Sequence, residues 1–286
     1  MTGPSKPETI VRAFHDACLD ELDALKPGNV HRFCADPRMD VADFEKSAAA
    51  AAPFIAAPGI GIGTRIRAAV EATSIAVGHN TNLGILLLAA PLAAAALDHS
   101  KGALQDRVGR VLAALTVADA QDAYLGIARA RPGGLGEVAE EDVAGEPTVT
   151  LLAAMQKGEA RDRIAWNYTH GFIDIFALGL ARLKHGVAHW GMGPWTVTFL
   201  YLGFLAQIPD SLIERKHGAR AAAHVLEEAA PIEASLAAAE SPEAMLQPLL
   251  AFDRSLKDRG FNPGTSADLT VATLFAAALQ DMEIRH

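Results

Sequence analysis

The chain has 286 residues, of which 34 are acidic and 25 are basic, so its formal net charge at pH 7 is −9. Half of the residues are hydrophobic and 21% are charged, which excludes general disorder. The acidic balance argues against nucleic acid as a partner, because nucleic-acid-binding domains usually carry a basic excess. Two cysteines, Cys18 and Cys34, make no disulfide framework, so a reduced, cytoplasmic setting is expected.

Apolar residues recur at helical spacing along nearly the whole chain. Ser5 and Glu8 have the spacing of a capping box, and an apolar face continues from there to Leu25. Pro27 ends this first helix, because it disfavours helical geometry at Lys26. Further helices are predicted over residues 40–56, 64–78, 82–97, 102–114, 117–130, 147–157, 159–184, 195–206, 211–239, 242–259 and 266–284. The sequence therefore predicts an all-α fold, a single domain over residues 1–286 built as a bundle of about ten helices.

Two stretches without Asp, Glu, Lys or Arg, residues 79–97 and 186–207, have the length of a membrane span. The first opens with four polar residues and contains Pro91, and the second contains His189 and Pro194. We interpret both as buried helices of a soluble core and expect no membrane partner. The N-terminal residues also lack the apolar core of a signal peptide.

Polar clusters at the ends of the predicted helices are candidate binding sites. The segment from Lys26 to Arg32 puts three potential cations, with His31 as the third, beside Gly28 and Asn29. Such a turn can hold phosphate through charge and through backbone N–H groups. An ordinary solvated helix end explains the same residues.

A glycine-rich loop, Pro-Gly-Ile-Gly-Ile-Gly-Thr-Arg, covers residues 58–65. No strand precedes it, so it is a poor match to a dinucleotide-binding loop. We predict a flexible loop with Thr64 capping the next helix, whose N-terminus could favour an anion.

Three polar residues, Asn80, Thr81 and Asn82, lie between two strongly apolar helices. Buried amides and hydroxyls must be hydrogen-bonded, and a ligand is one way to achieve this. Capping of the helix that follows is the alternative.

Carboxylates follow a second glycine-rich segment, which runs from Pro132 to Glu137. They could bind Mg²⁺, which takes one or two protein carboxylates together with substrate phosphates. An acidic surface loop is the alternative interpretation.

Arg161, Asp162 and Arg163 open one long predicted helix, on which Arg163, Asn167, His170 and Asp174 form one polar stripe. The stripe is either a binding surface or the solvent face of an amphipathic helix. Near the C-terminus, Gly264, Ser266 and Asp268 stand at the start of the last helix, which is a further candidate phosphate site.

In this order the motifs resemble those of the triphosphoribosyl-dephospho-CoA synthase family, all-helical proteins of the systems that make the prosthetic group of citrate lyase and malonate decarboxylase. The matching motifs are Lys26-Pro27-Gly28, Met39-Asp40 with Phe44 and Ser47-Ala48, Asn80-Thr81 with Gly84, Gly136-Glu137, and Pro263-Gly264 with Ser266-Ala267-Asp268-Leu269.

The resemblance implies a transferase that joins ATP to 3'-dephospho-CoA, with Mg²⁺ as cofactor and with adenine released. It implies phosphate or substrate contacts at Lys26, Gly28, Asn29, His31, Arg32, Asn80, Thr81, Asn82, Asp162, Arg163, Gly264 and Ser266. It implies catalytic carboxylates at Asp40, Glu137 and Asp268, of which Glu137 and Asp268 are the candidate Mg²⁺ ligands. The base among the three is left open.

The chain departs from the family at two points. Family members usually read Asn-Thr-His-Lys/Arg-Gly, whereas this chain has Asn82 and Leu83 in the middle, and Arg38 stands where an acidic residue is expected. The sequences of the Lys-Pro-Gly and Asn-Thr motifs resemble those of a divergent branch of the family in archaea and methylotrophic bacteria. That branch is associated with C1-carrier cofactors of the methanopterin and methanofuran type. The acceptor that the resemblance implies therefore stays open.

Other classes of function remain as alternatives. One is a related pentosyl or phosphoribosyl transfer in C1-carrier biosynthesis, and another is Mg²⁺-dependent hydrolysis of an N-glycosidic or phosphate bond. A third is a non-catalytic helical binding protein. The apolar content permits a homodimer without demanding one.

Overall fold

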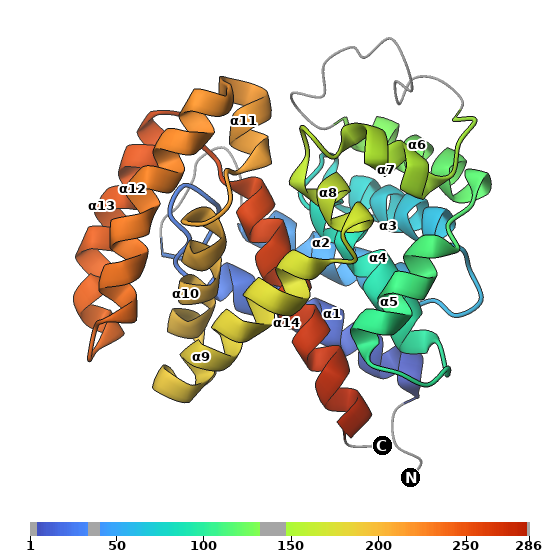
Figure 1. Cartoon of the computed structure of the whole chain (residues 1–286), viewed down its shortest axis with the longest axis horizontal. Coiled ribbons are helices and arrows are strands. Elements are labelled where there is room, and N and C mark those ends of the chain that lie inside the picture. The colour runs from blue at the N-terminus through green and yellow to red at the C-terminus, as the bar shows by residue number, and fades with distance from the viewer. Residues whose placement is uncertain (1–4, 34–40, 132–146, 285–286) are drawn as a thin grey trace. The chain divides into compact units, whose positions relative to one another are not determined.

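The computed structural model describes residues 5–33, 41–131 and 147–284, and within these ranges the chain is helical and has no β-strand (Figure 1). The all-α prediction is thus confirmed. The helices are α1 (Lys6–Asp23), α2 (Val41–Ile55), α3 (Ile62–Val77), α4 (Leu83–Leu97), α5 (Leu104–Ala113), α6 (Val117–Ala130), α7 (Leu151–Gly158), α8 (Arg163–Thr169), the π-helix η1 (Asp174–Gly179), α9 (Leu180–Trp190), α10 (Pro194–Leu205), α11 (Ser211–His217), α12 (Ala219–Ala237), the 3₁₀-helix η2 (Pro242–Met245), α13 (Leu246–Asp258) and α14 (Gly264–Ile284).

The chain forms two compact units. Unit 1 comprises Met1–Cys18, Ala42–Ile173 and Phe275–His286. Unit 2 comprises Leu19–Val41 and Asp174–Leu274. The single domain predicted over residues 1–286 stays a prediction.

Unit 1 is built around α4, which packs against α3, α5 and α8. Twelve of its 15 residues are buried, because the sequence from Leu83 to Leu97 is apolar on every side of the helix. The first charge-free stretch is therefore a core helix, as predicted.

Pro91 lies inside α4 and leaves the carbonyl of Leu87 without its helical partner, because proline has no backbone N–H. The buried hydroxyl of Tyr168 donates to that carbonyl at 2.6 Å. The hydrogen bond thus satisfies the gap in α4 and ties α8 to it. Burial raises the pKa of Tyr168, so the phenol keeps its proton.

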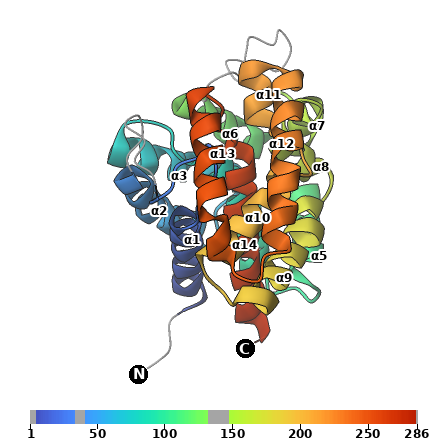
Figure 2. The same cartoon turned by 90° about the vertical axis from the view of Figure 1, so that its left-hand side faces the viewer.

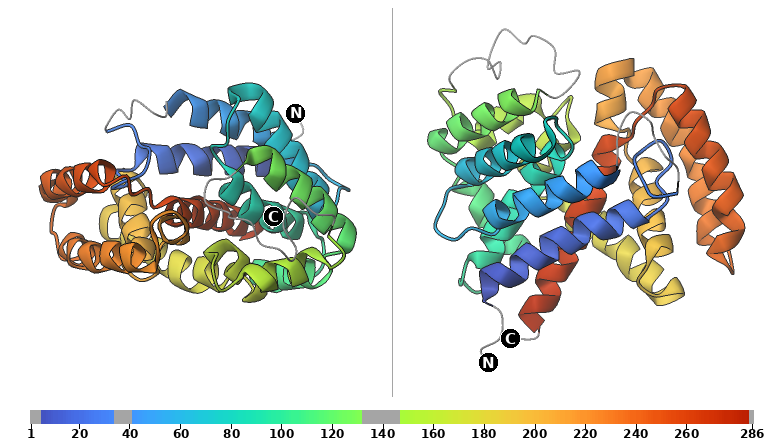
Figure 3. Two further views of the ribbon diagram at one scale, coloured as in Figure 1. Left: turned by 90° about the horizontal axis from the view of Figure 1, so that it is seen from above. Right: turned by 180° about the vertical axis from the view of Figure 1, so that it is seen from behind.

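α3 and α6 lie side by side in unit 1, as the rear view in Figure 3 shows. Glycines allow this close approach, since a Cβ on Gly63 would lie 2.2 Å from the carbonyl oxygen of Asp119. The N-cap of α3 is Gly61 rather than the predicted Thr64. Thr64 lies inside the helix, and its hydroxyl donates to Asp122 at 2.6 Å.

Unit 2 has α10 at its centre, packed against α9, α12 and η1. Ten of the 12 residues of α10 are buried, so the second charge-free stretch is a core helix from Pro194 to Leu205. The first residues of this stretch belong to the end of α9, where Val187 and His189 are exposed. α12 lies beside α10 in Figure 2, and Arg259 joins it to the end of α13 through hydrogen bonds to Glu228 at 3.2 and 2.7 Å.

Within the described ranges, no single helix combines the length and apolar character that a membrane span requires. α5 and α6 have the required length and composition only when they are taken together, and the two helices meet at a bend of 96°.

The described ranges contain fourteen α-helices, whereas the sequence predicted a bundle of about ten and marked twelve helical ranges. The structure divides two of those ranges. The segment 159–184 is interrupted at Gly171 and Phe172, whose φ values of +60° and +58° are left-handed. The segment 211–239 divides at Gly218, where φ is +88°. The proposed stripe from Arg163 to Asp174 was therefore wrong as one helix face.

Replacing Tyr168 with Phe should lower the free energy of unfolding by about 1–3 kcal/mol, because the Leu87 carbonyl would be buried without a donor. A Pro91→Ala background supplies a backbone N–H to that carbonyl, so the same replacement should cost clearly less there. Urea unfolding of the four proteins measures both costs. Equal costs in the two backgrounds would contradict this account of α4.

Candidate functional site

The Lys-Pro-Gly segment forms a tight turn directly after α1. The N–H of Asn29 donates to the carbonyl of Lys26 at 3.0 Å, and Gly28 has a φ of +82° that favours glycine. The Asn29 side-chain oxygen accepts the N–H of Val30 at 2.8 Å. Every residue from Lys26 to Val30 is buried, so the turn is part of the core rather than a solvated helix end.

The two Pro-Gly motifs at opposite ends of the sequence meet in unit 2. A Cβ on Gly28 would lie 2.8 Å from Cδ of Pro263, and Nδ2 of Asn29 donates to Oδ1 of Asn262 at 2.8 Å. The Tyr201 hydroxyl, buried on α10, donates to the carbonyl of Pro27 at 2.7 Å. The structure thus brings together two of the segments that the sequence indicated.

Lys26 is a buried cation with a buried partner. Its ammonium group donates to Glu21 and lies 3.4 Å from the side-chain oxygen of Asn29, and only 1% of the residue is exposed. Burial lowers the pKa of Lys26 and raises that of Glu21, against their mutual attraction. The negative charge of Asp268 also favours the charged form of Lys26, which links Asp268 on α14 to this turn.

Asp253 on α13 binds the backbone of the turn, and the sequence alone did not indicate this residue. Its Oδ1 accepts the N–H of Gly28 at 2.8 Å, and Nζ of Lys257 lies 3.0 Å from both of its oxygens. Burial opposes ionisation, but contacts with His31, Gly28 and Lys257 outweigh it and hold the pKa of Asp253 below its ordinary value. Asp253 is therefore ionised at neutral pH.

His31 faces the same carboxylate and is fully buried. Its Nδ1 accepts the N–H of Phe33 at 3.2 Å, which leaves the ring proton on Nε2. Nε2 lies 3.3 Å from Oδ1 of Asp253 without the geometry of a hydrogen bond. Burial lowers the pKa of His31, so the imidazole is neutral and supports the turn.

The side chain of Asp210, the residue before α11, lies against the first turn of α14, where a phosphate site was predicted. Its Oδ2 accepts the N–H and the hydroxyl of Ser266 at 2.8 and 2.9 Å. Its Oδ1 accepts the N–H groups of Leu212 and Ile213 at 3.0 and 3.2 Å. One buried carboxylate thus caps both α11 and α14, and the donors of Ser266 are already taken.

In unit 1, Asp119 likewise caps two helices, one of which is α3 with its glycine-rich start. Its Oδ1 accepts the N–H of Gly63 at 3.0 Å, while Oδ2 completes a capping box with Thr116 at the start of α6. The helix N-terminus that the sequence suggested for an anion therefore holds an internal carboxylate.

The Asn80 to Asn82 segment forms a second polar group, in unit 1. Oδ1 of Asn80 caps α4 by accepting the N–H groups of Asn82 and Leu83 at 3.3 and 3.0 Å. The Thr81 hydroxyl donates to Ser47 on α2 at 2.7 Å, which joins two of the predicted motifs. The amide of Asn82 is buried and donates to Thr73 at 3.2 Å.

Asp162 is the N-cap of α8, with Oδ1 accepting the N–H groups of Ile164 and Ala165 at 2.8 and 3.2 Å. The Arg163 guanidinium stacks over the ring of Trp166 at 3.6 Å. Arg32 is partly exposed and pairs with Asp23. Two of the three predicted catalytic carboxylates, Asp40 and Glu137, lie outside the described residues.

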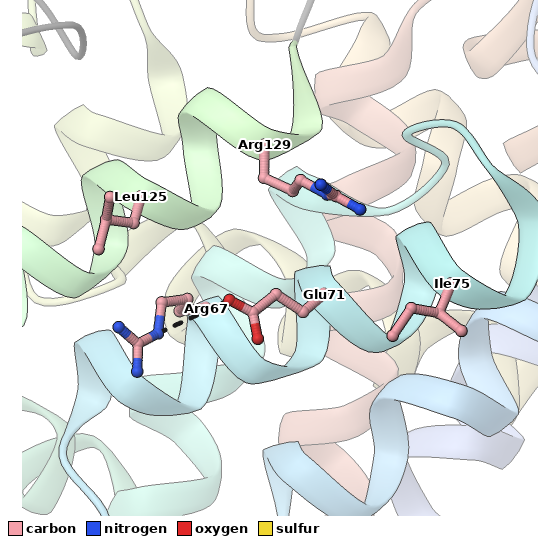
Figure 4. Close-up of a pocket in the computed structure, with 5 residues that line it drawn as sticks. All are labelled: Arg67, Glu71, Ile75, Leu125 and Arg129. Atoms are coloured by element: carbon pink, nitrogen blue, oxygen red, sulfur yellow. Dashed lines mark ion pairs between the residues drawn. The ribbon is translucent and has the colours of Figure 1, made fainter.

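A pocket of about 390 Å³ between α3 and α6 is lined by none of the predicted site residues (Figure 4). It is lined by Arg67, Glu71, Ile75, Leu125 and Arg129. Arg67 pairs with Asp122 at 2.8 Å, and Arg129 donates to Ser74 at 3.1 Å, so both guanidinium groups already have partners in unit 1.

Comparison with known proteins identifies relatives of the whole chain. A family model named CitG and described as ATP:dephospho-CoA triphosphoribosyl transferase matches residues 7–285. A crystal structure from Archaeoglobus fulgidus, of a protein named as a candidate triphosphoribosyl-dephospho-CoA synthase, is similar with a TM-score of 0.63. It is 24% identical and covers 82% of this chain and 97% of its own, which supports the fold. No curated protein matches the chain.

Replacing Asp253 with Asn should lower the free energy of unfolding by about 1–3 kcal/mol at pH 7, because bonds to a buried carboxylate are weakened. The folded-state pKa lies below the unfolded value. The contribution is therefore complete above the unfolded pKa of about 3.9 and is lost as the pH falls through the folded pKa. Urea unfolding should give a constant difference between the two proteins from about pH 7 to 5 and a smaller one in more acid solution.

The matched control for this series is Asp258→Asn, which removes an exposed carboxylate from the same helix. Its effect should stay within about 0.5 kcal/mol throughout. A difference for Asp253→Asn that is undiminished at pH 3 would contradict the assignment.

Proposed function

The chain belongs to the CitG family of ATP:dephospho-CoA triphosphoribosyl transferases, and on that premise we propose that the polar cluster around the Lys26–Asn29 turn holds the nucleotide. The chain is accordingly a transferase.

The contact between the two Pro-Gly motifs carries this proposal. Asn29 and Asn262 are 233 residues apart in the sequence, yet their side chains are hydrogen-bonded in unit 2. The same cluster contains two ammonium groups, Lys26 and Lys257, and the charge of the partly exposed Asp268 carboxylate acts on Lys26. Cations and a carboxylate in one place suit a substrate that carries both phosphates and a reacting sugar.

The proposed reaction forms a bond between a ribose 2'-hydroxyl of the acceptor and C1' of the ATP ribose. The bond from C1' to adenine breaks, the hydroxyl proton passes to a base, and adenine leaves with a proton from an acid. An oxocarbenium-like transition state of this kind is stabilised by carboxylates. Asp268 is the described carboxylate that we propose for this role, while Asp40 and Glu137 remain proposed on the resemblance alone.

Mg²⁺ is proposed to enter with the phosphates of ATP rather than to occupy a cage of protein ligands. In the described ranges, no group of three or more His, Cys, Asp or Glu side chains could hold a metal ion. Mg²⁺ commonly uses one or two carboxylates and completes its shell with phosphate and water, so Asp268 fits as one ligand.

Asn80 and Thr81 are proposed to contact a sugar or base edge. Because Asn80 uses its side-chain oxygen to cap α4, its contact with a ligand would come from its amide NH₂ group. Thr81 would act together with Ser47, to which its hydroxyl donates.

The wild-type protein incubated with ATP, Mg²⁺ and dephospho-CoA should release free adenine, measured by chromatography. Asp268→Asn should slow the release by about 10²- to 10⁴-fold, as expected for loss of a base or of charge stabilisation. Asp258→Asn, an exposed carboxylate of unit 2, should leave the rate unchanged. Wild-type turnover in Asp268→Asn would remove Asp268 from the site.

Omitting the acceptor separates the classes of function. Adenine or phosphate released from ATP without an acceptor would indicate a hydrolase. ATP binding without any turnover would indicate a non-catalytic binding protein.

A different acceptor is the second candidate, and one observation favours it. At the positions where family members usually carry His and a cation, this chain has Asn82 and Leu83, which are both buried in unit 1. An intermediate of a methanopterin- or methanofuran-type carrier is proposed as the alternative. Adenine release that requires such an intermediate and ignores dephospho-CoA would select it.

A further inference from the structure

Lys257 is the more accessible of the two ammonium groups beside the Lys26–Asn29 turn. Its side chain is 13% exposed, whereas that of Lys26 is 1% exposed. Lys26 already donates to Glu21 and lies within reach of Asn29. A ligand arriving from solvent would therefore meet Lys257 before Lys26.

The position of Lys257 is tied to the turn through a single carboxylate. Asp253 lies one helical turn earlier on α13, and both of its oxygens are 3.0 Å from the Lys257 ammonium. Oδ1 of the same carboxylate accepts the Gly28 N–H at 2.8 Å. Since an ammonium group has three donors, Lys257 can bind a further oxygen while Asp253 holds it in place.

The ammonium groups of Lys26 and Lys257 lie near each other, and the carboxylates of Glu21 and Asp253 beside them already accept hydrogen bonds within the cluster. The positive charge of Lys257 acts on Lys26 and, after burial and the opposing effect of Glu21, contributes to the lowered pKa of Lys26. A phosphate group against the more exposed Lys257 would lessen this repulsion, because its negative charge offsets that of the ammonium group.

We propose that Lys257, positioned by Asp253, is a phosphate-binding residue that contacts the triphosphate group of the nucleotide next to the Lys26–Asn29 turn. This inference rests on the proposed function of that cluster. It adds to the site a residue outside the motifs that carry the family resemblance.

Calorimetric titration of the full chain with inorganic triphosphate tests the inference directly. Lys257→Met should weaken binding by about 10- to 100-fold, the loss expected for a charge-assisted hydrogen bond. Lys257→Arg should retain most of the affinity, because it keeps the charge. Lys184→Met, which removes an exposed cation from α9 in the same unit, should bind as the wild type does.

Kinetics provide a readout that a purely structural role would not move. Lys257→Met should raise the KM for ATP by about the factor lost in binding, and the KM for the acceptor should stay unchanged. Unchanged triphosphate affinity in a folded Lys257→Met protein would overturn the inference.

Chemical modification of the wild-type protein keeps the test decisive if Lys257→Met does not fold. Triphosphate should slow acetylation of Lys257, followed by mass spectrometry, and leave that of Lys184 unchanged. Equal acetylation of Lys257 with and without triphosphate would overturn the inference.

The outcomes separate this inference from the proposed function. Adenine release by the wild type that is unaffected in Lys257→Met would refute the role of Lys257 and leave the function standing. Triphosphate binding that depends on Lys257, in a protein that never releases adenine, would refute the function and leave the phosphate contact standing.

Discussion

Carboxylates that accept backbone N–H bonds from distant segments are the interaction on which both units depend. Asp119 binds the start of α3, Asp210 joins the starts of α11 and α14, and Asp253 binds the N–H of Gly28. A charge buried in a helical core rich in alanine and leucine is costly unless several donors compensate it. Asp210 and Asp253 are buried and accept several donors each, although burial still raises the pKa of Asp210. Asp119 is partly exposed. All three carboxylates fix segments that are distant in the sequence to one another.

The same arrangement limits where a substrate phosphate can bind. A helix N-terminus is an anion site because its first N–H groups lack partners. At the glycine-containing starts of α3 and α14, an aspartate of the chain already fills that role. The proposed phosphate contact therefore relies on a side-chain cation, and Lys257 beside the Lys26–Asn29 turn is more accessible than Lys26.

The motif order was sufficient to identify the family, and the Lys26–Gly28 and Asn262–Gly264 segments that it singled out meet in the structure. The roles of individual residues were harder to predict. His31 and Lys26 were expected on phosphates, and the structure buries both beside Asp253 and Glu21. A signal for these carboxylates did exist. Asp253 lies on the same helix face as Leu249 and Leu256, which are both buried, and a charge in such a position indicates an internal partner.

By itself, the sequence determined the all-helical class, the two core helices α4 and α10, and membership of the family, because periodicity and motif order are local properties of the chain. It could not determine that Gly171 and Gly218 interrupt long helices, since a glycine is compatible with either conformation. Only the tertiary structure decided which carboxylate meets which N–H group. The partners of Gly63 and Ser266 are 56 residues away in the sequence, and that of Gly28 is 225 away. Such pairs depend on how whole helices pack, which no local pattern encodes.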